Sequence, residues 1–188
     1  AGVPALVNRI SFTGELGYEI YVAPHFQLKL YEELTKAGKE FNIKPFGGRA
    51  LMSMRLEKNW GAWTLDYRPD FTAKETGLDA FINWDKDFIG KDSAQKDESK
   101  NKLVPLIVET NDIDVTYNEA VLKGDKSIGY ITSGGFAHFV NKSVAFSYVD
   151  QNELKSEKGI QVEINGDFFN CSIIKDPLYD PSGQKMRS

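Results

Sequence analysis

The chain of 188 residues is short of the residues that build the commonest catalytic and metal sites. Its single cysteine, Cys171, excludes an internal disulfide, and its two histidines, His25 and His138, lie far apart without the spacing of zinc ligands. The sequence also lacks the phosphate-binding patterns GxGxxG and GxxxxGK and the G-x-S-x-G elbow of many hydrolases. We therefore predict no metal site, and the residues alone identify no catalytic group.

Two further absences limit the partners. Lys and Arg total 23 against 27 Asp and Glu, and the resulting net charge of -4 argues against a nucleic-acid binder, which would need a basic face. No apolar run approaches the roughly 20 residues that cross a bilayer, and no signal-peptide pattern opens the chain. We predict neither a nucleic-acid nor a membrane partner, and a reducing, cytoplasmic location. Because the chain begins with Ala1 and enters a strand almost at once, we expect it to be part of a longer protein.

The most informative stretch that is present is a hairpin pattern. Strand formers in residues 5–12 and 18–22 flank Thr13-Gly14-Glu15-Leu16-Gly17, which predicts a tight reversal. Two glycines, which reach positive φ at no steric cost, bracket Glu15 and would present its carboxylate at the tip. A carboxylate held in this way can accept two parallel hydrogen bonds from a planar ring with adjacent N–H donors. The alternative is an ordinary surface glutamate in a polar turn.

Two helices are predicted next. Apolar residues recur every three or four positions from His25 to Phe41, which is typical of an amphipathic helix. A second helix, from about Gly48 to Trp60, has so many apolar residues in its first turns that we expect it to be buried. Arg55 lies on that helix, and we interpret it first as one partner of a structural salt bridge, because buried charges are normally paired.

An aromatic-rich segment follows, with Trp60 and Trp63 at its start. Rings in such a loop either stack on a flat ligand or cover the core. Residues 81–84, Phe-Ile-Asn-Trp, predict a short strand. The charged residues from Asp85 to Lys102 predict a solvated helix and a linker.

The rest of the chain predicts only strands. The turn pairs Gly124-Asp125 and Asn165-Gly166 each separate two of them, and Ser133-Gly134-Gly135-Phe136 ends another, where we favour a turn over close approach to a ligand. The candidate strands are Leu103–Glu109, Ala120–Leu122, Ser127–Ser133, Ser143–Val149, Gln161–Ile164 and Asp167–Ile174. We therefore predict an α+β domain over residues 1–101 and an all-β domain over residues 102–188, the latter a small antiparallel barrel of Greek-key or jelly-roll type.

Motifs spread over the chain resemble those of one family. The order and spacing of three of them resemble the glycine-cleavage T-protein (aminomethyltransferase) family, namely Ser11–Glu19, Met54–Lys58 and Ile131–Gly135. Three runs look most similar to the folate-binding C-terminal portion of dimethylglycine dehydrogenase and sarcosine dehydrogenase: Arg49–Lys58, Asp87–Lys91 and Asp176–Pro181. The resemblance covers nearly the whole chain and implies an incomplete T-protein-like folate-binding domain followed by the family's terminal barrel.

The resemblance also implies a function. It implies tetrahydrofolate as the cofactor and a small N-methylated amine as the substrate. In the dehydrogenase relatives a separate flavin domain oxidises an N-methyl group to an iminium, and the tetrahydrofolate domain captures the one-carbon unit as 5,10-methylenetetrahydrofolate. FAD would then belong only to a missing N-terminal part of the same protein. By the resemblance Glu15 matches the glutamate that grips the pterin ring, and Tyr18, Trp60 and Trp63 complete the predicted cofactor-binding set.

The sequence departs from the family in two ways. T-proteins carry a folate-contacting arginine four residues before the Arg-Leu-Glu triplet, where this chain has Leu51, so Arg49 is the candidate for the ligand's acidic tail. The family's catalytic aspartate belongs to the half that precedes this sequence, so the catalytic residues are unknown and the isolated chain should be inactive. The alternatives are a stand-alone aminomethyltransferase, a folate-dependent demethylase of the family, or a non-catalytic folate-binding module, whose K-G-C-Y-x-G-Q-E signature is absent.

Overall fold

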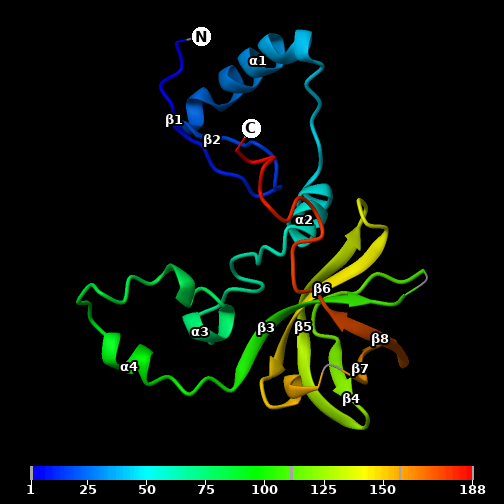
Figure 1. The fold of residues 1–188 in the computed structure, drawn as a ribbon. Coiled ribbons are helices and arrows are strands. Elements are labelled where there is room, and N and C mark those ends of the chain that lie inside the picture. Colours follow the sequence, from blue (N-terminus) through cyan, green and yellow to red (C-terminus); the bar gives the residue numbers. More distant parts are fainter. Residues whose placement is uncertain (1, 111, 157, 188) are drawn as a thin grey trace.

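In the computed structural model, which describes residues 2–110, 112–156 and 158–187, a barrel lies beneath a hairpin and a set of helices (Figure 1). The part before the barrel contains β1 Leu6–Asn8, β2 Glu19–Tyr21, η1 Pro24–Phe26, α1 Gln27–Gly38, η2 Lys39–Phe41, α2 Gly48–Glu57, α3 Ala73–Thr76, η3 Asp79–Phe81 and α4 Lys91–Gln95. The barrel contains β3 Asn101–Val108, β4 Ala120–Lys123, β5 Lys126–Ala137, β6 Lys142–Asp150, η4 Glu153–Lys155, β7 Ile160–Ile164 and β8 Asp167–Ile173.

The six barrel strands are all antiparallel and neighbour one another in the order β3-β6-β5-β4-β7-β8. Pairing of β3 with β8, for example Leu106 opposite Ile173, closes the sheet on itself. Strands β4, β5 and β6 follow one another as a meander, and the last of them, β6, pairs with β3, the strand that precedes the meander in the chain. This is a Greek-key arrangement. The predicted antiparallel barrel and all six predicted strands are confirmed.

Local sequence explains the barrel's tightest connection. Asn165 and Gly166 join β7 to β8 with φ values of 53° and 90°. A two-residue hairpin of type I′ needs positive φ at both positions, and Asn-Gly is the pair that tolerates it best. The strand before this turn alternates buried and half-buried residues, so one face of β7 points into the barrel.

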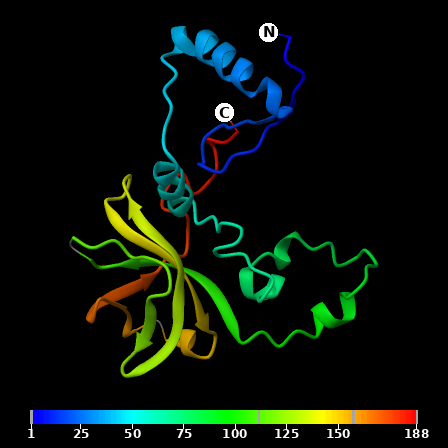
Figure 2. The same cartoon turned by 180° about the vertical axis from the view of Figure 1, so that it is seen from behind.

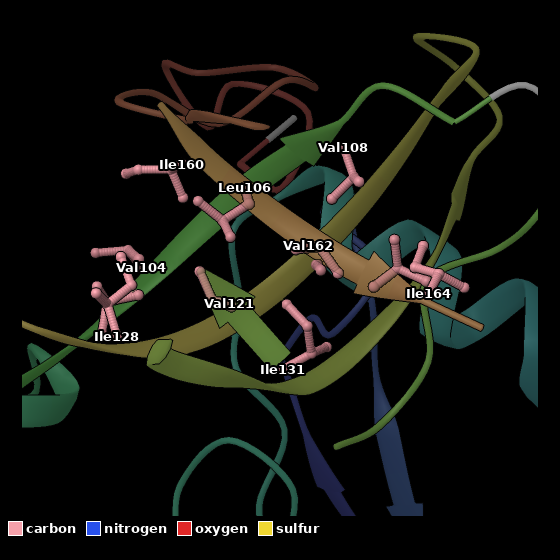
Figure 3. Packing of buried hydrophobic residues seen from close by; sticks show 12 residues of the cluster. Val104, Leu106, Val108, Val121, Ile128, Ile131, Ile160, Val162 and Ile164 are labelled. Atoms are coloured by element: carbon pink, nitrogen blue, oxygen red, sulfur yellow. The ribbon is translucent and has the colours of Figure 1, made fainter. Parts of the chain in front are cut away.

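The main core fills the barrel, where side chains from its strands point toward one another (Figure 3). Its buried members are Val104, Leu106, Val108, Val115, Val121, Ile128, Ile131, Ala145, Val149, Ile160, Val162 and Ile164. A second apolar cluster packs Leu56 of α2 against residues of β5, β6 and the segment after β8 on the outer side of the barrel. Because burying one large aliphatic side chain contributes about 1.5–3 kcal/mol, these two clusters stabilise the barrel and attach α2 to it.

The hairpin at the start of the chain is shorter than predicted. Only three residue pairs join β1 to β2, and residues 9–18 form the loop between them. The predicted tight reversal at Thr13–Gly17 is therefore wrong, because those residues lie inside a wider loop. Of its two glycines only Gly14 has positive φ, whereas Gly17 allows close approach, since a Cβ there would lie 2.7 Å from the Ile10 carbonyl oxygen.

The helices follow the predicted positions more closely than the predicted burial. The amphipathic helix expected between His25 and Phe41 is confirmed as α1 with short 3-10 turns at both ends. The expectation that α2 is buried is wrong for its first turns, since its buried residues are Arg55, Leu56 and Glu57. The reason is that the last turn is the part packed against the outer side of the barrel, which leaves the first turn exposed.

The strand predicted at residues 81–84 is absent from the described structure. The chain forms a 3-10 turn at this point, in which Phe81 N donates to Leu78 O at 3.0 Å and Ile82 N donates to Asp79 O at 3.1 Å. A strand needs a partner for its backbone groups, and these local hydrogen bonds satisfy them instead.

The turn predicted at Ser133–Phe136 is also wrong. Both glycines lie inside β5, which continues to Ala137. A Cβ on Gly134 would lie 2.5 Å from the carbonyl oxygen of Val115, so the position allows two backbone segments to touch.

After β8 the chain leaves the barrel and runs back to the loop between β1 and β2 in both views of the molecule (Figures 1 and 2). We call residues 175–187 the C-terminal tail and residues 9–18 the Glu15 loop. Strand β3 begins at Asn101, close to the predicted domain boundary, but the tail packs outside the barrel. The division into residues 1–101 and 102–188 stays a prediction.

Candidate functional site

The Glu15 loop is shaped by its own polar side chains. Gly14 N donates to Ser11 Oγ at 3.0 Å, and Glu15 N donates to Thr13 Oγ1 at 3.4 Å. Gly14 has a φ of 87°, and a Cβ at that position would lie 2.5 Å from the Lys58 side chain. The loop therefore rests directly on α2's C-terminal end, and the Glu15 side chain is exposed.

Lys58 joins the Glu15 loop to the C-terminal tail. Its side chain is only 3% exposed, and its Nζ donates to the Asp180 carbonyl oxygen at 2.7 Å and lies 3.5 Å from Asp180 Oδ2. The same ammonium lies 5.7 Å from the centre of the Trp60 ring and 6.0 Å from that of Tyr179. A buried cation with a carbonyl, a carboxylate and two aromatic faces around it is well compensated.

The tail contributes a tyrosine to this cluster. Tyr179 N donates to Glu57 O at 3.0 Å, its ring packs edge-on against Phe139, and its hydroxyl donates to Glu15 Oε1. Buried Glu57 in turn accepts a hydrogen bond from Phe139 N at 2.6 Å. The carboxylate of Glu15 is thus connected, through the tail, to α2 and to the barrel.

The other predicted cofactor-binding residues lie in different surroundings. Trp60 is half-buried over Lys58, in the same cluster as Tyr179. Trp63 is 75% exposed and meets Tyr67 edge-on with ring centres 5.5 Å apart. Tyr18 is exposed at the end of the Glu15 loop. The geometry therefore connects Glu15 with Trp60, and the structure does not bring Tyr18 or Trp63 into that cluster.

Arg49 lies at the other end of α2. Helix geometry places it about 12 Å along the axis from Glu57. It lines a cavity of about 480 Å³ between α2, β5 and residues 114–116, together with His138 and Asp114. Within the described part of the chain Arg49 has no ion-pair partner.

Arg55 has the carboxylate partner that the sequence predicts. Its Nη1 lies 2.7 Å from Asp66 Oδ2, and both side chains are fully buried. Asp66 Oδ2 also accepts from Ala62 N at 2.7 Å, while Oδ1 accepts from the hydroxyls of Thr132 and Ser133 on β5. Burial lowers the pKa of the Arg55 guanidinium, and Asp66 opposes that shift. This network is structural, because it attaches α2 and the following loop to the barrel wall.

Sequence reasoning named Glu15 but missed Tyr179 and Lys58. The two lie far from Glu15 in sequence, and no local pattern marks either as its neighbour. The available signal is the family resemblance, since Lys58 ends the Arg49–Lys58 run and Tyr179 lies in the Asp176–Pro181 run, but it says nothing about their contacts. Among the described residues no group of three or more His, Cys, Asp or Glu side chains is arranged to hold a metal ion, and none of the helices described is long and apolar enough to span a membrane.

Comparison with known proteins identifies the fold and the family of the chain. The model of the GCVT N-terminal domain matches residues 1–86, and the model of the glycine cleavage T-protein C-terminal barrel domain matches residues 101–180. The chain belongs to the glycine cleavage T-protein (aminomethyltransferase) family. The barrel match begins where β3 begins, and the N-terminal match contains the Glu15 loop and α2.

Individual members of the T-protein family are similar over almost the whole chain. Mitochondrial dimethylglycine dehydrogenase of Mus musculus is 37% identical over 181 residues, which is 94% of this chain and 21% of that protein. The aminomethyltransferase of Pseudothermotoga lettingae is 33% identical over 180 residues, 95% of this chain and 49% of that protein. The crystal structure of the glycine cleavage system aminomethyltransferase T from Bartonella henselae superimposes with a TM-score of 0.80 at 25% identity, over 93% of this chain and 50% of that one. This chain therefore spans about a fifth of the dehydrogenase and about half of the aminomethyltransferases.

Proposed function

We propose that this chain is the tetrahydrofolate-binding, one-carbon-transfer portion of a dimethylglycine or sarcosine dehydrogenase-like protein. The observation that carries the proposal is the Glu15 carboxylate, exposed on a loop that is attached to α2 and to the C-terminal tail. Higher identity to dimethylglycine dehydrogenases, 36–38%, than to the aminomethyltransferases compared, 30–33%, favours the dehydrogenase type.

The residues present fit a reduced folate at its two ends. The pterin ring offers an amino group and a neighbouring N–H side by side, and a fixed carboxylate can accept both hydrogen bonds. One Glu15 oxygen accepts from Tyr179, but a carboxylate has about four lone-pair sites, so acceptor capacity remains. Arg49, beside its cavity at the far end of α2, suits the carboxylates of the glutamyl tail.

Bound tetrahydrofolate would supply the nitrogens that accept the one-carbon unit. Within this chain, Glu15 would bind and orient the pterin, Trp60 and Tyr179 would provide aromatic surface beside it, and Arg49 would hold the acidic tail. Tyr18 and Trp63 stay in the proposed binding set as exposed rings near the loop and after α2. No proton-transfer residue for the folate nitrogens is assigned among these side chains.

The remaining activity belongs, in this proposal, to a longer protein. Because the chain spans about a fifth to about half of the relatives it matches, we infer that a preceding part supplies the catalytic aspartate and, in the dehydrogenase case, the FAD domain that oxidises a small N-methylated amine. That part would also cover the apolar residues that α1 and the hairpin expose, such as Leu6, Leu28 and Tyr31. The isolated chain would then bind folate weakly and turn over no substrate. We propose a cytoplasmic location for the protein.

A stand-alone aminomethyltransferase is the second candidate. The observation that favours it is the similarity of aminomethyltransferases over 95–98% of this chain, including both of its parts. A flavin-binding region encoded upstream of this sequence would support the dehydrogenase proposal. An upstream region that encodes only the N-terminal half of a T-protein would support the aminomethyltransferase.

The test is the affinity of the protein for 5-formyltetrahydrofolate, a stable reduced folate, measured by calorimetry. We expect Glu15→Gln to raise Kd by about 10-fold to 100-fold, because a hydrogen bond to a charged group contributes about 1.5–3 kcal/mol. Glu19→Gln, on strand β2 of the same hairpin, is the matched control and should leave Kd unchanged. In the intact protein Glu15→Ala should abolish methylenetetrahydrofolate formation and leave flavin reduction intact. Equal loss of both activities would indicate a folding defect and contradict the assigned role.

A further inference from the structure

The contact between Tyr179 and Glu15 joins the two ends of the described chain. The Tyr179 hydroxyl donates to Glu15 Oε1 across 164 residues of sequence. The tyrosine is also held in place by contacts that do not involve Glu15.

Three groups hold the Tyr179 ring. Its backbone N–H donates to Glu57 O at 3.0 Å, and its ring packs edge-on against Phe139 at 4.9 Å between centres. The Lys58 ammonium lies 6.0 Å from the ring centre, and its carbon chain passes beneath Gly14 of the Glu15 loop. The hydroxyl is therefore presented to the loop by a ring whose position other residues fix.

The segment that carries Tyr179 is itself ordered by the next residue. Asp180 accepts backbone hydrogen bonds from Gln184 at 3.1 Å and Lys185 at 3.0 Å, and its carbonyl oxygen accepts from Lys58. A second link comes from Arg9, whose guanidinium donates to Met186 O at 3.4 Å. The tail thus forms a folded turn against the Glu15 loop.

We propose that Tyr179 is a positioning residue that orients the Glu15 carboxylate for the ring of a reduced pterin. The inference rests on the proposed function of Glu15. A glutamate on an exposed loop can rotate about three side-chain bonds, and a hydrogen bond to one oxygen from a fixed donor selects one orientation. The carboxylate lone pairs that remain can then accept two parallel hydrogen bonds from the ligand. Because the Glu15 side chain is already oriented, binding no longer costs the entropy of fixing its rotations.

The contact can be tested without any ligand. The hydrogen bond to Glu15, together with burial and the nearby carboxylates of Glu15, Asp180 and Glu57, raises the pKa of the Tyr179 phenol. Carbon NMR of labelled tyrosine rings should show Tyr179 ionising above the ordinary value of about 10 in the wild type, and closer to it in Glu15→Gln. A wild-type Tyr179 that ionises at the ordinary value would overturn the inference.

The ligand test uses Tyr179→Phe, which keeps the packed ring and removes only the hydroxyl. We expect Kd for 5-formyltetrahydrofolate to rise about threefold to tenfold, the loss typical of one hydrogen bond, with an unchanged melting temperature. In the Glu15→Gln background the same substitution should have no further effect, because the coupling runs through Glu15.

Tyr21→Phe is the matched control. The Tyr21 hydroxyl donates to Glu19 Oε2 at 2.5 Å, which makes a second tyrosine–glutamate pair on the same hairpin. Loss of this hydrogen bond should leave the Kd for 5-formyltetrahydrofolate unchanged. If the wild-type protein does not bind the reduced folate, the proposed function fails. If the wild-type protein binds and the Tyr179→Phe variant binds equally well, only the positioning role fails. The same conclusion follows if Tyr179→Phe weakens binding by the same factor in the wild-type and in the Glu15→Gln backgrounds.

Discussion

The barrel and the first fifty residues of the chain are built on opposite principles. In the barrel, strands paired on both sides enclose a core in which residues such as Leu106, Val121 and Ile131 are completely buried. Among residues 2–50, only Gly14 is buried, and apolar side chains such as Leu28 and Tyr31 on α1 are 69% and 61% exposed. Helix α1 nevertheless has the apolar spacing of a helix that packs against something.

The difference shows which part of the family fold is self-sufficient. A closed sheet needs no further element to satisfy its edges or its core. A hairpin and an amphipathic helix have an apolar side that gains nothing until another surface covers it. We therefore expect the barrel to tolerate isolation and residues 2–50 to depend on additional structure.

The sharpest test of this comparison sets a buried ion pair against an exposed one. Asp66→Asn should lower the free energy of unfolding by about 3–5 kcal/mol, because it leaves the Arg55 guanidinium uncompensated in the interior. Glu33→Gln, which breaks the Lys29–Glu33 pair on the surface of α1, should cost at most about 0.5 kcal/mol. Urea denaturation measures both, and similar losses would contradict the contrast between the interior that packs against the barrel, where Arg55 and Asp66 lie, and the exposed first fifty residues.

The second test compares two leucines. Leu106→Ala removes a side chain with no exposed surface from the barrel core and should cost about 2–5 kcal/mol. Leu28→Ala removes one that is mostly exposed on α1 and should change the free energy of unfolding by about 0.5 kcal/mol or less. A large loss for Leu28→Ala would mean that α1 is covered in solution, for instance by a second copy of the chain.

The third test compares the reactivity of two thiols, and the substitution that it needs should change the free energy of unfolding least. Burial in the barrel wall raises the pKa of Cys171 to about 12, so almost no thiolate is present at pH 8. A cysteine introduced by Ala37→Cys on exposed α1 should keep an ordinary pKa near 8.5 and react with iodoacetamide about a hundredfold to a thousandfold faster. Mass spectrometry after timed quenching separates the two sites, and equal rates would show that the barrel opens readily.

Local chemistry made much of the fold predictable. The six barrel strands combine β-branched residues with turn pairs such as Asn165-Gly166, whose backbone needs are specific. Helix α1 was predictable from its apolar period alone. The predictions failed where tertiary contacts decided the outcome. Gly134, for example, lies in a strand and lets the backbone of Val115 come close, where a turn was predicted.

The candidate site was predictable only in part. Glu15 could be proposed from the hairpin pattern and the family likeness, and a carboxylate partner for Arg55 from general rules on buried charge. Neither the identity of that partner, Asp66, nor the contact of Glu15 with Tyr179 could be inferred, because they depend on how distant segments meet. The position of Arg49 beside a cavity likewise required the packing of α2 on the barrel.

The return of the C-terminal tail has a consequence for how the protein is made. The entropy cost of closing a loop grows only slowly with its length, so the separation of 164 residues adds little to the free-energy cost of this contact at equilibrium. A ribosome, however, releases the chain from its N-terminus, and the barrel strands are complete at Ile173, before Tyr179 has emerged. Until the residues that follow β8 have emerged, the Glu15 loop therefore has no Tyr179 hydroxyl beside it, and the orientation of its carboxylate is set only after the barrel strands have been made.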